Sequence, residues 1–168
     1  MNNLKINLQN VQETLLLPLW GRAVESQKEK PLLYDDVALS IMKSISYDFS
    51  AITNNISKLV QATWIARSIF FDKKIKEFIS QHPEATIVNI GCGLDTTFNR
   101  VDNGKIMWFD LDLPETIELR RQFIAETERQ KFITESVFNQ SWFNSIPNKQ
   151  NLMFLFAGVI YYFNEQEV

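Results

Sequence analysis

Two glycines end a short run that is rich in β-branched residues, and an acidic residue follows them closely. The run is Thr86–Ile90, the glycines are Gly91 and Gly93, and the acid is Asp95. Glycine lets the backbone turn sharply, and it lets a ligand approach the main chain closely. A strand that ends in such a turn is typical of α/β proteins that bind a nucleotide at one edge of their sheet.

A second apolar run ends on acid and supplies the other half of such a site. It finishes on Asp110 and Asp112, and an acid in this place can accept hydrogen bonds from ribose hydroxyls. Because side chains alternate along a strand, both acids are expected on the same face. The pattern therefore predicts a nucleoside site between the glycine turn and the acid-tipped strand.

The residues of the turn distinguish between nucleoside ligands. A dinucleotide-binding turn has a third glycine where this chain has Thr96. The carboxylate of Asp95 would also repel a pyrophosphate, because like charges disfavour each other. A positively charged nucleoside suits the turn better, and S-adenosyl-L-methionine, with its sulfonium and ammonium groups, is such a ligand. A nicotinamide-binding domain is the less favoured alternative.

The composition is that of an ordinary globular protein. The 168 residues, 45% of them hydrophobic and 22% charged, are enough for one domain with a sizeable core. The net charge of −3 gives no basic footprint for nucleic acid, and basic pairs such as Arg120-Arg121 are expected on solvated helix faces. The sequence contains no apolar run of membrane-spanning length and no signal-peptide core. We expect a cytoplasmic protein with no nucleic-acid or membrane partner.

Histidine and cysteine are too few for several kinds of chemistry. His82 and Cys92 are the only residues of their types. This excludes a metal site built from several histidines or cysteines and an internal disulfide. His82 is expected at the end of a helix, away from the loops, so we expect no Ser-His-Asp triad. We expect no metal ion, and the sequence identifies no catalytic residue.

The chain is expected to have two parts that together form one structural unit. Residues 1–82 have the apolar spacing of helices, and residues 83–168 alternate between strand and helix patterns. Pro18 is expected to kink or divide the first helix, and Asp35 or Asp36 to cap the second. The predicted helices are 11–26, a segment through residue 45, 56–81 as one helix or a broken pair, a very short helix or turn at 96–101, and 115–129. The predicted strands are 86–90, 105–109, 131–134 and 152–156.

The last predicted strand, 152–156, is apolar on both faces and is therefore expected in the centre of a parallel sheet. Asn164, followed by acidic residues, has the pattern of a helix start. A sheet that stops there would leave an apolar edge without a neighbour. We expect either that the C-terminal strands are missing from a fragment or that a second copy of the chain covers the edge.

Two motifs together resemble a known family. Segments 89–98 and 108–114 are similar to those of the leucine carboxyl methyltransferases and their bacterial relatives, the polyketide O-methyltransferases of the tetracenomycin type. The resemblance extends from Glu13 to Phe163 and so covers nearly the whole chain. The resemblance implies a class I S-adenosylmethionine-dependent methyltransferase with a Rossmann-like, doubly wound, mostly parallel α/β sheet and an N-terminal helical lid.

The resemblance also implies a set of cofactor contacts. Arg67 matches the arginine that holds the methionine carboxylate, and Asp112 matches the acid that binds the ribose diol. Asp95 matches the acid after the turn, although it could instead cap the helix that follows. Ser136 and Val137 match the segment that contacts the adenine. With Asp110 as the near neighbour of Asp112, the cofactor-binding residues expected from the resemblance are Arg67, Gly91, Gly93, Asp95, Asp110, Asp112, Ser136 and Val137.

One position departs from the family pattern, because relatives carry a glutamate where this chain has Ala157. Two functions follow as hypotheses. The first is an O-methyltransferase acting on a small-molecule, polyketide-like carboxylate or hydroxyl. The second is a truncated, inactive cofactor-binding module that forms a homodimer through its open sheet edge.

Overall fold

The computed structural model describes residues 13–166, and the chain forms two compact units. The first consists of the residues up to Lys73 together with Leu94–Arg100. The second consists of Lys74–Gly93 and the residues from Val101 onward. This division differs from the sequence-based one at residue 82, because the segment that follows the glycine turn belongs with the helices.

The first unit is helical. Asp35 caps the second helix, since its side chain accepts a hydrogen bond from Ala38 N. Pro18 lies inside a single first helix, so of the two expected effects the division is wrong, and the kink stays a prediction. Its neighbours Leu16 and Leu19 are fully buried, and their packing offsets the hydrogen bond that proline cannot donate. The helices are α1 (Glu13–Ser26), α2 (Asp36–Ser44), α3 (Ser50–Thr53) and α4 (Lys58–Gln81), and α4 continues into the second unit.

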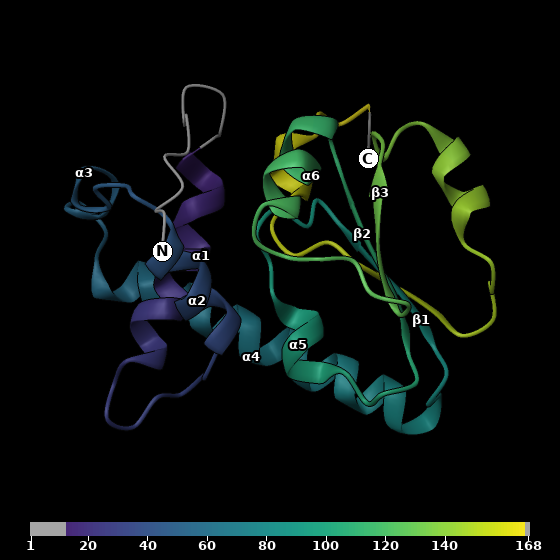
Figure 1. Cartoon of the computed structure of the whole chain (residues 1–168), viewed down its shortest axis with the longest axis horizontal. Helices are drawn as coiled ribbons and strands as arrows, with labels where there is room; N and C mark the ends of the chain where they lie inside the picture. The colour runs from purple at the N-terminus through teal and green to yellow at the C-terminus, as the bar shows by residue number, and fades with distance from the viewer. Residues whose placement is uncertain (1–12, 167–168) are drawn as a thin grey trace. The chain divides into compact units, whose positions relative to one another are not determined.

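The second unit is built on a sheet of four parallel strands (Figure 1). Their spatial order is β3-β2-β1-β4, so the chain crosses over between neighbours. This confirms the predicted Rossmann-like α/β fold. The strands are β1 (Thr86–Ile90), β2 (Met107–Asp112), β3 (Gln130–Thr134) and β4 (Leu152–Leu155).

Each face of this sheet is covered by a different segment. The helix α6 (Pro114–Arg121) packs on one face and buries Ile117 and Leu119. The helical turn η2 (Gln140–Ser145) covers the other face, on the opposite side of the sheet in Figure 1. That second face contributes a compact apolar core, made of Val88, Ile90, Phe109, Leu111, Ile133 and Ile146.

Several ends of helices and strands differ from the predicted ones. The second strand begins at Met107 and continues to Asp112, so both acids lie within β2 rather than after it. The helix expected to reach residue 129 ends at Arg121, because the chain must turn back before Trp108 N can bond the carbonyl of Arg129. The short helix α5 spans Thr97–Val101, close to its predicted range.

The expectation of a central fourth strand is wrong for the described sheet. Within residues 13–166, β4 pairs only with β1, and Phe154 is 42% exposed. Asn164 accepts a hydrogen bond from Gln166 N in a turn, and the helix expected beyond it falls partly outside the described residues.

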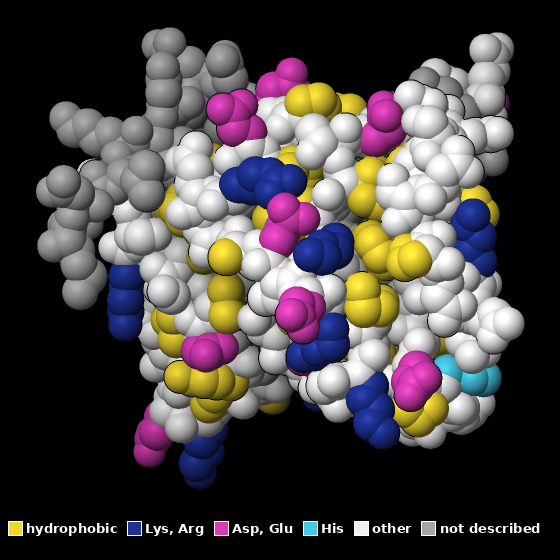
Figure 2. Space-filling model, turned by 45° about the vertical axis from the view of Figure 1, so that its right-hand side comes forward, with side chains coloured by type: hydrophobic (Ala, Val, Ile, Leu, Met, Phe, Trp, Pro, Cys, Tyr) yellow, Lys and Arg dark blue, Asp and Glu magenta, His cyan; other side chains and the backbone are white. Residues whose placement is uncertain are grey.

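The surface shown in Figure 2 is mixed in character. Basic and acidic side chains alternate on this face, with apolar side chains between them. None of the helices within residues 13–166 combines the length and the apolarity that crossing a membrane requires.

Position 91 requires glycine both because of its backbone conformation and because a neighbouring side chain leaves no space for a Cβ atom. Its φ is +65°, and a Cβ atom there would lie 2.6 Å from Cγ2 of Val159. Val159 follows β4, so this contact closes the segment after β4 over the glycine turn. Gly104 also has a positive φ, +81°, but a Cβ atom there would have no neighbour within 4 Å.

We predict that Gly91→Ala lowers the free energy of unfolding by roughly 2–4 kcal/mol, from backbone strain and from the clash together. Gly104→Ala is the matched control and should cost only the strain, about 1–2 kcal/mol. Urea unfolding of both variants measures the difference. Equal losses would contradict the packing role of Val159.

Candidate functional site

The glycine turn after β1 is hydrogen-bonded to the end of β2. The amides of Gly91 and Cys92 donate to the carbonyl of Leu111, at 2.8 and 3.3 Å. The amide of Gly93 donates to Oδ2 of Asp112 at 2.8 Å. The parallel register, in which Ile90 lies opposite Leu111, brings the turn and the acid together. The structure thus joins the two motifs that the sequence analysis singled out.

Asp112 is a carboxylate held in place but not enclosed. Oδ2 accepts from Gly93, Oδ1 accepts from the amide of Leu113 at 2.8 Å, and the side chain is partly exposed. Burial raises the pKa of Asp112, while these two hydrogen bonds and one from Thr116 oppose the rise. Each carboxylate oxygen has lone pairs for a further donor. A fixed carboxylate of this kind suits the two hydroxyls of a ribose.

Asp110 lies two residues earlier on β2 but is fully buried. Oδ2 accepts from Arg120 at 2.7 Å and from Gln130 at 2.8 Å. Oδ1 accepts from the Trp108 indole at 2.9 Å and from the Asn89 amide at 3.2 Å. These four donors hold Asp110 inside the second unit, so Asp112 is the acid that the end of β2 presents outward.

Arg120 is a site residue that the sequence analysis missed. Its side chain is 1% exposed, so the expectation of a solvated helix face is wrong at this position. One terminal nitrogen donates to Asp110, and the other donates to the carbonyl of Gly93 at 3.0 Å. Arg120 lies three residues after the buried Ile117, on the same side of α6, and that spacing was the available signal.

Arg120 therefore connects the core to the glycine turn. Gly93 is held at both of its polar groups, since its carbonyl accepts from Arg120 and its amide donates to Asp112. The guanidinium group is planar and rigid, so it fixes the direction of both partners. The position of the Asp112 carboxylate consequently depends on a buried ion pair on the same strand.

Asp95 and Arg67 lie in the first unit. Asp95 caps α5, because its carboxylate accepts from the amide of Thr97 at 3.1 Å and from the Thr97 hydroxyl at 3.0 Å. This confirms the capping alternative and leaves its cofactor role as a prediction. Arg67 is half-buried on α4, and its cofactor role is likewise a prediction.

Ser136 and Val137 follow β3 at the edge of the sheet where Asp112 ends β2. The amide of Glu135 donates to the carbonyl of Asp112 at 3.1 Å, which ties the start of this segment to β2. Val137 packs against the apolar core, and its carbonyl accepts from the Trp142 indole at 2.9 Å. The structure therefore brings Gly91, Gly93, Asp110, Asp112, Ser136 and Val137 into one unit.

The glycine turn beside the acidic end of β2 agrees with the protein family that the chain matches. A family model described as leucine carboxyl methyltransferase matches residues 16–168. The chain belongs to the leucine carboxyl methyltransferase family. Membership confirms the family predicted from the glycine turn and the acidic strand end.

Two relatives of the chain have names that state a function. The tetracenomycin polyketide synthesis O-methyltransferase TcmP of Streptomyces glaucescens is 31% identical over 96% of this chain and 60% of its own length. The S-adenosyl-L-methionine-dependent methyltransferase dpfgK of Gibberella zeae is 28% identical over 98% of this chain and 60% of its own length. The chain thus spans about three fifths of these methyltransferases.

Between residues 13 and 166, no group of three or more His, Cys, Asp or Glu side chains is arranged to hold a metal ion. Cys92 is buried in the glycine turn.

We predict that Arg120→Met lowers the free energy of unfolding by about 3–5 kcal/mol, because it leaves the buried charge of Asp110 without its partner. Arg121→Met is the control; Arg121 pairs with Glu126 at the surface, and its loss should cost at most about 1 kcal/mol. Urea unfolding measures both. A cost for Arg120→Met no larger than for Arg121→Met would rule out the ion pair as the support of the turn.

Proposed function

We propose that this chain is the cofactor-binding part of an S-adenosyl-L-methionine-dependent O-methyltransferase. One observation carries the proposal. The carboxylate of Asp112 is fixed by two backbone amides beside the glycine turn and remains partly exposed. Family membership and the name of the Gibberella relative support the choice of donor.

The residues have distinct tasks in this proposal. Asp112 accepts hydrogen bonds from the ribose hydroxyls, and Gly91 and Gly93 let the nucleoside approach the main chain. Arg67 holds the methionine carboxylate with its guanidinium fork, and Asp95 attracts the positively charged part of the donor. Ser136 and Val137 contact the adenine. When bound, the donor would supply an electrophilic methyl group; the acceptor oxygen would form the new bond to the methyl carbon in line with the breaking bond to sulfur, which would leave as the thioether of S-adenosylhomocysteine.

The acceptor is a small-molecule carboxylate or hydroxyl of polyketide-like character. The name of the Streptomyces relative supports this class. A carboxylate is already a nucleophile, whereas a hydroxyl must lose its proton to a base. Methyl transfer asks the protein mainly to align the reactants and to exclude water, so the proposal assigns no catalytic residue.

We predict that the chain binds both S-adenosyl-L-methionine and S-adenosylhomocysteine in calorimetry. Asp112→Ala should weaken binding by roughly 1.5–3 kcal/mol, the range for a hydrogen bond to a charged group. Glu115→Ala, which removes an exposed acid from the first turn of α6, is the control and should bind as the wild type. Binding of neither nucleoside by the wild type would refute the proposal. Adding candidate acceptors and measuring S-adenosylhomocysteine then tests turnover.

A second function is favoured by the open edge of the sheet. We propose, as the alternative, a cofactor-binding module without turnover that forms a homodimer through β4. Among the described strands β4 has one neighbour, and Phe154 and Phe156 beside this edge are 42% and 37% exposed. Ala157, in place of the family's glutamate, agrees with a loss of turnover.

We predict that the chain sediments as a dimer at concentrations near 100 μM, and that Phe154→Lys makes it a monomer, because a charge on an edge strand opposes pairing. Phe70→Lys is the control; Phe70 is 55% exposed on α4, and the variant should remain a dimer. A wild-type chain that stays monomeric would contradict the dimer.

A further inference from the structure

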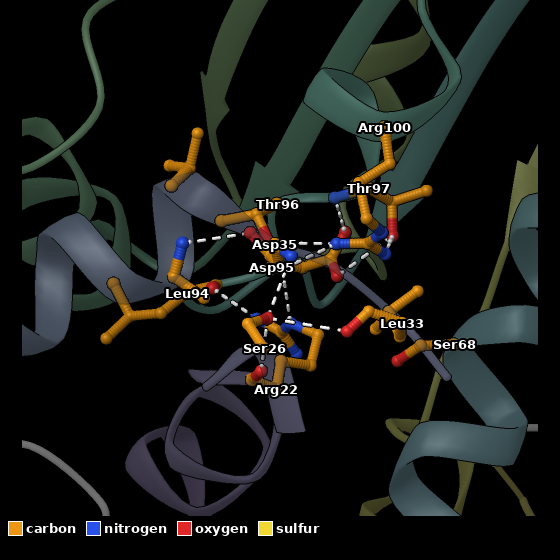
Figure 3. Close-up of polar contacts among 12 residues, drawn as sticks. Arg22, Ser26, Leu33, Asp35, Ser68, Leu94, Asp95, Thr96, Thr97 and Arg100 are labelled. Carbon is orange, nitrogen blue, oxygen red and sulfur yellow. Dashed lines mark hydrogen bonds and ion pairs between the residues drawn. The ribbon is translucent and has the colours of Figure 1, made fainter. Parts of the chain in front are cut away.

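Asp35 is fully buried at the start of α2 and accepts four hydrogen bonds. Oδ2 accepts from Arg22 Nε at 2.9 Å, from Arg100 at 2.7 Å and from the hydroxyl of Thr96. Oδ1 accepts from the amide of Ala38 at 2.9 Å. Figure 3 shows the two arginine side chains converging on this carboxylate. Asp35 therefore does more than cap a helix.

The two arginines hold the residues that follow the glycine turn. Arg22 donates to the carbonyl of Leu94 at 3.0 Å. Arg100 donates to the hydroxyl of Thr97 at 2.9 Å, and that hydroxyl donates to the carboxylate of Asp95. A chain of hydrogen bonds thus runs from Asp35 to Asp95 within the first unit.

Arg100 is fixed on its other side by Asp72. Its Nε and one terminal nitrogen donate to the two oxygens of that carboxylate, at 2.8 and 2.9 Å. Burial alone would lower the pKa of Arg100, but the hydrogen bond to Asp72 and the charges of Asp95, Asp72 and Asp35 raise it. The guanidinium group is therefore a permanent, immobile cation beside Asp95.

The charges of the two arginines and of the three carboxylates around them do not sum to zero. Arg22 and Arg100 contribute two positive charges, and the three carboxylates of Asp35, Asp72 and Asp95 contribute three negative charges, which leaves one negative charge. Asp95 interacts electrostatically with both arginines, so the excess charge belongs to the five side chains together. This net negative charge can act on a positively charged ligand.

We propose that Asp35 is a positioning residue for the cofactor. It acts through Arg22, Arg100 and Thr97 to fix the carboxylate of Asp95, and it keeps the local charge negative. The inference rests on the proposed function, in which Asp95 attracts a positively charged donor. We therefore expect the preference of the chain for S-adenosyl-L-methionine over S-adenosylhomocysteine to depend on Asp35, because the first carries a sulfonium and the second a neutral thioether.

The test compares the affinities of both nucleosides in Asp35→Asn, which keeps the shape of the side chain and removes its charge. We expect the affinity for S-adenosyl-L-methionine to fall about tenfold. The factor by which the affinity for S-adenosylhomocysteine falls should be roughly three to ten times smaller. Asp36→Asn is the matched control, since Asp36 is exposed and adjacent, and both affinities should stay unchanged. In an Asp95→Asn background, adding Asp35→Asn should change the affinity ratio little.

Three results would overturn the inference. One is wild-type affinity in folded Asp35→Asn; another is an equal loss for both nucleosides, which marks a merely structural role. The third is an unchanged ratio of the two nucleoside affinities in Thr96→Val, a variant that lacks one hydroxyl donor to Asp35. This variant provides the test if Asp35→Asn does not fold. Thr96→Val should weaken S-adenosyl-L-methionine binding about threefold. A wild-type chain that binds neither nucleoside refutes the proposed function instead.

Discussion

The register between β1 and β2 is the constraint on which the site depends. Because the strands run in parallel with Ile90 opposite Leu111, the glycine turn leaves β1 directly beside the end of β2. The amides of Gly91 and Gly93 then find their acceptors on β2, at the carbonyl of Leu111 and the carboxylate of Asp112. A register shift by one residue would turn the acid to the other face of the sheet. The strand pairing thus determines where the carboxylate of Asp112, the proposed ribose ligand, lies relative to the glycine turn.

Buried ion pairs support the turn in both compact units. In the second unit Arg120 connects Asp110 to the carbonyl of Gly93. In the first, Arg22 connects Asp35 to the carbonyl of Leu94, the next residue along the chain. A buried charge without its partner is costly, so each pair holds its geometry firmly. The carbonyl of Gly93 and the carbonyl of Leu94, the residue that follows the turn, are therefore each held by an arginine of their own unit.

Features that depend on the local residue pattern, such as strand bounds, could be predicted from the sequence. The burial of single side chains and the number of neighbours of a strand could not. The bounds of β1 were right, because a β-branched run between a proline and a glycine has sharp limits. Alternation placed Asp110 and Asp112 on one face, but no local pattern showed that only Asp110 is fully buried. Arg120 was missed because a basic residue on a helix is usually solvated. The apolar pattern of β4 indicated covered faces, and it does not reveal whether a strand has two neighbours.

The ribose of the cofactor is the ligand that we propose for the glycine turn and Asp112. The most direct measurement is a titration of the isotopically labelled chain with S-adenosylhomocysteine, followed through backbone amide signals by NMR. The amides of Gly93 and Leu113 donate to Asp112, so both signals should move as the nucleoside binds. The amide of Gly104, which donates to Asp102 in an exposed turn, should stay in place. Binding that leaves Gly93 and Leu113 unmoved would contradict the account.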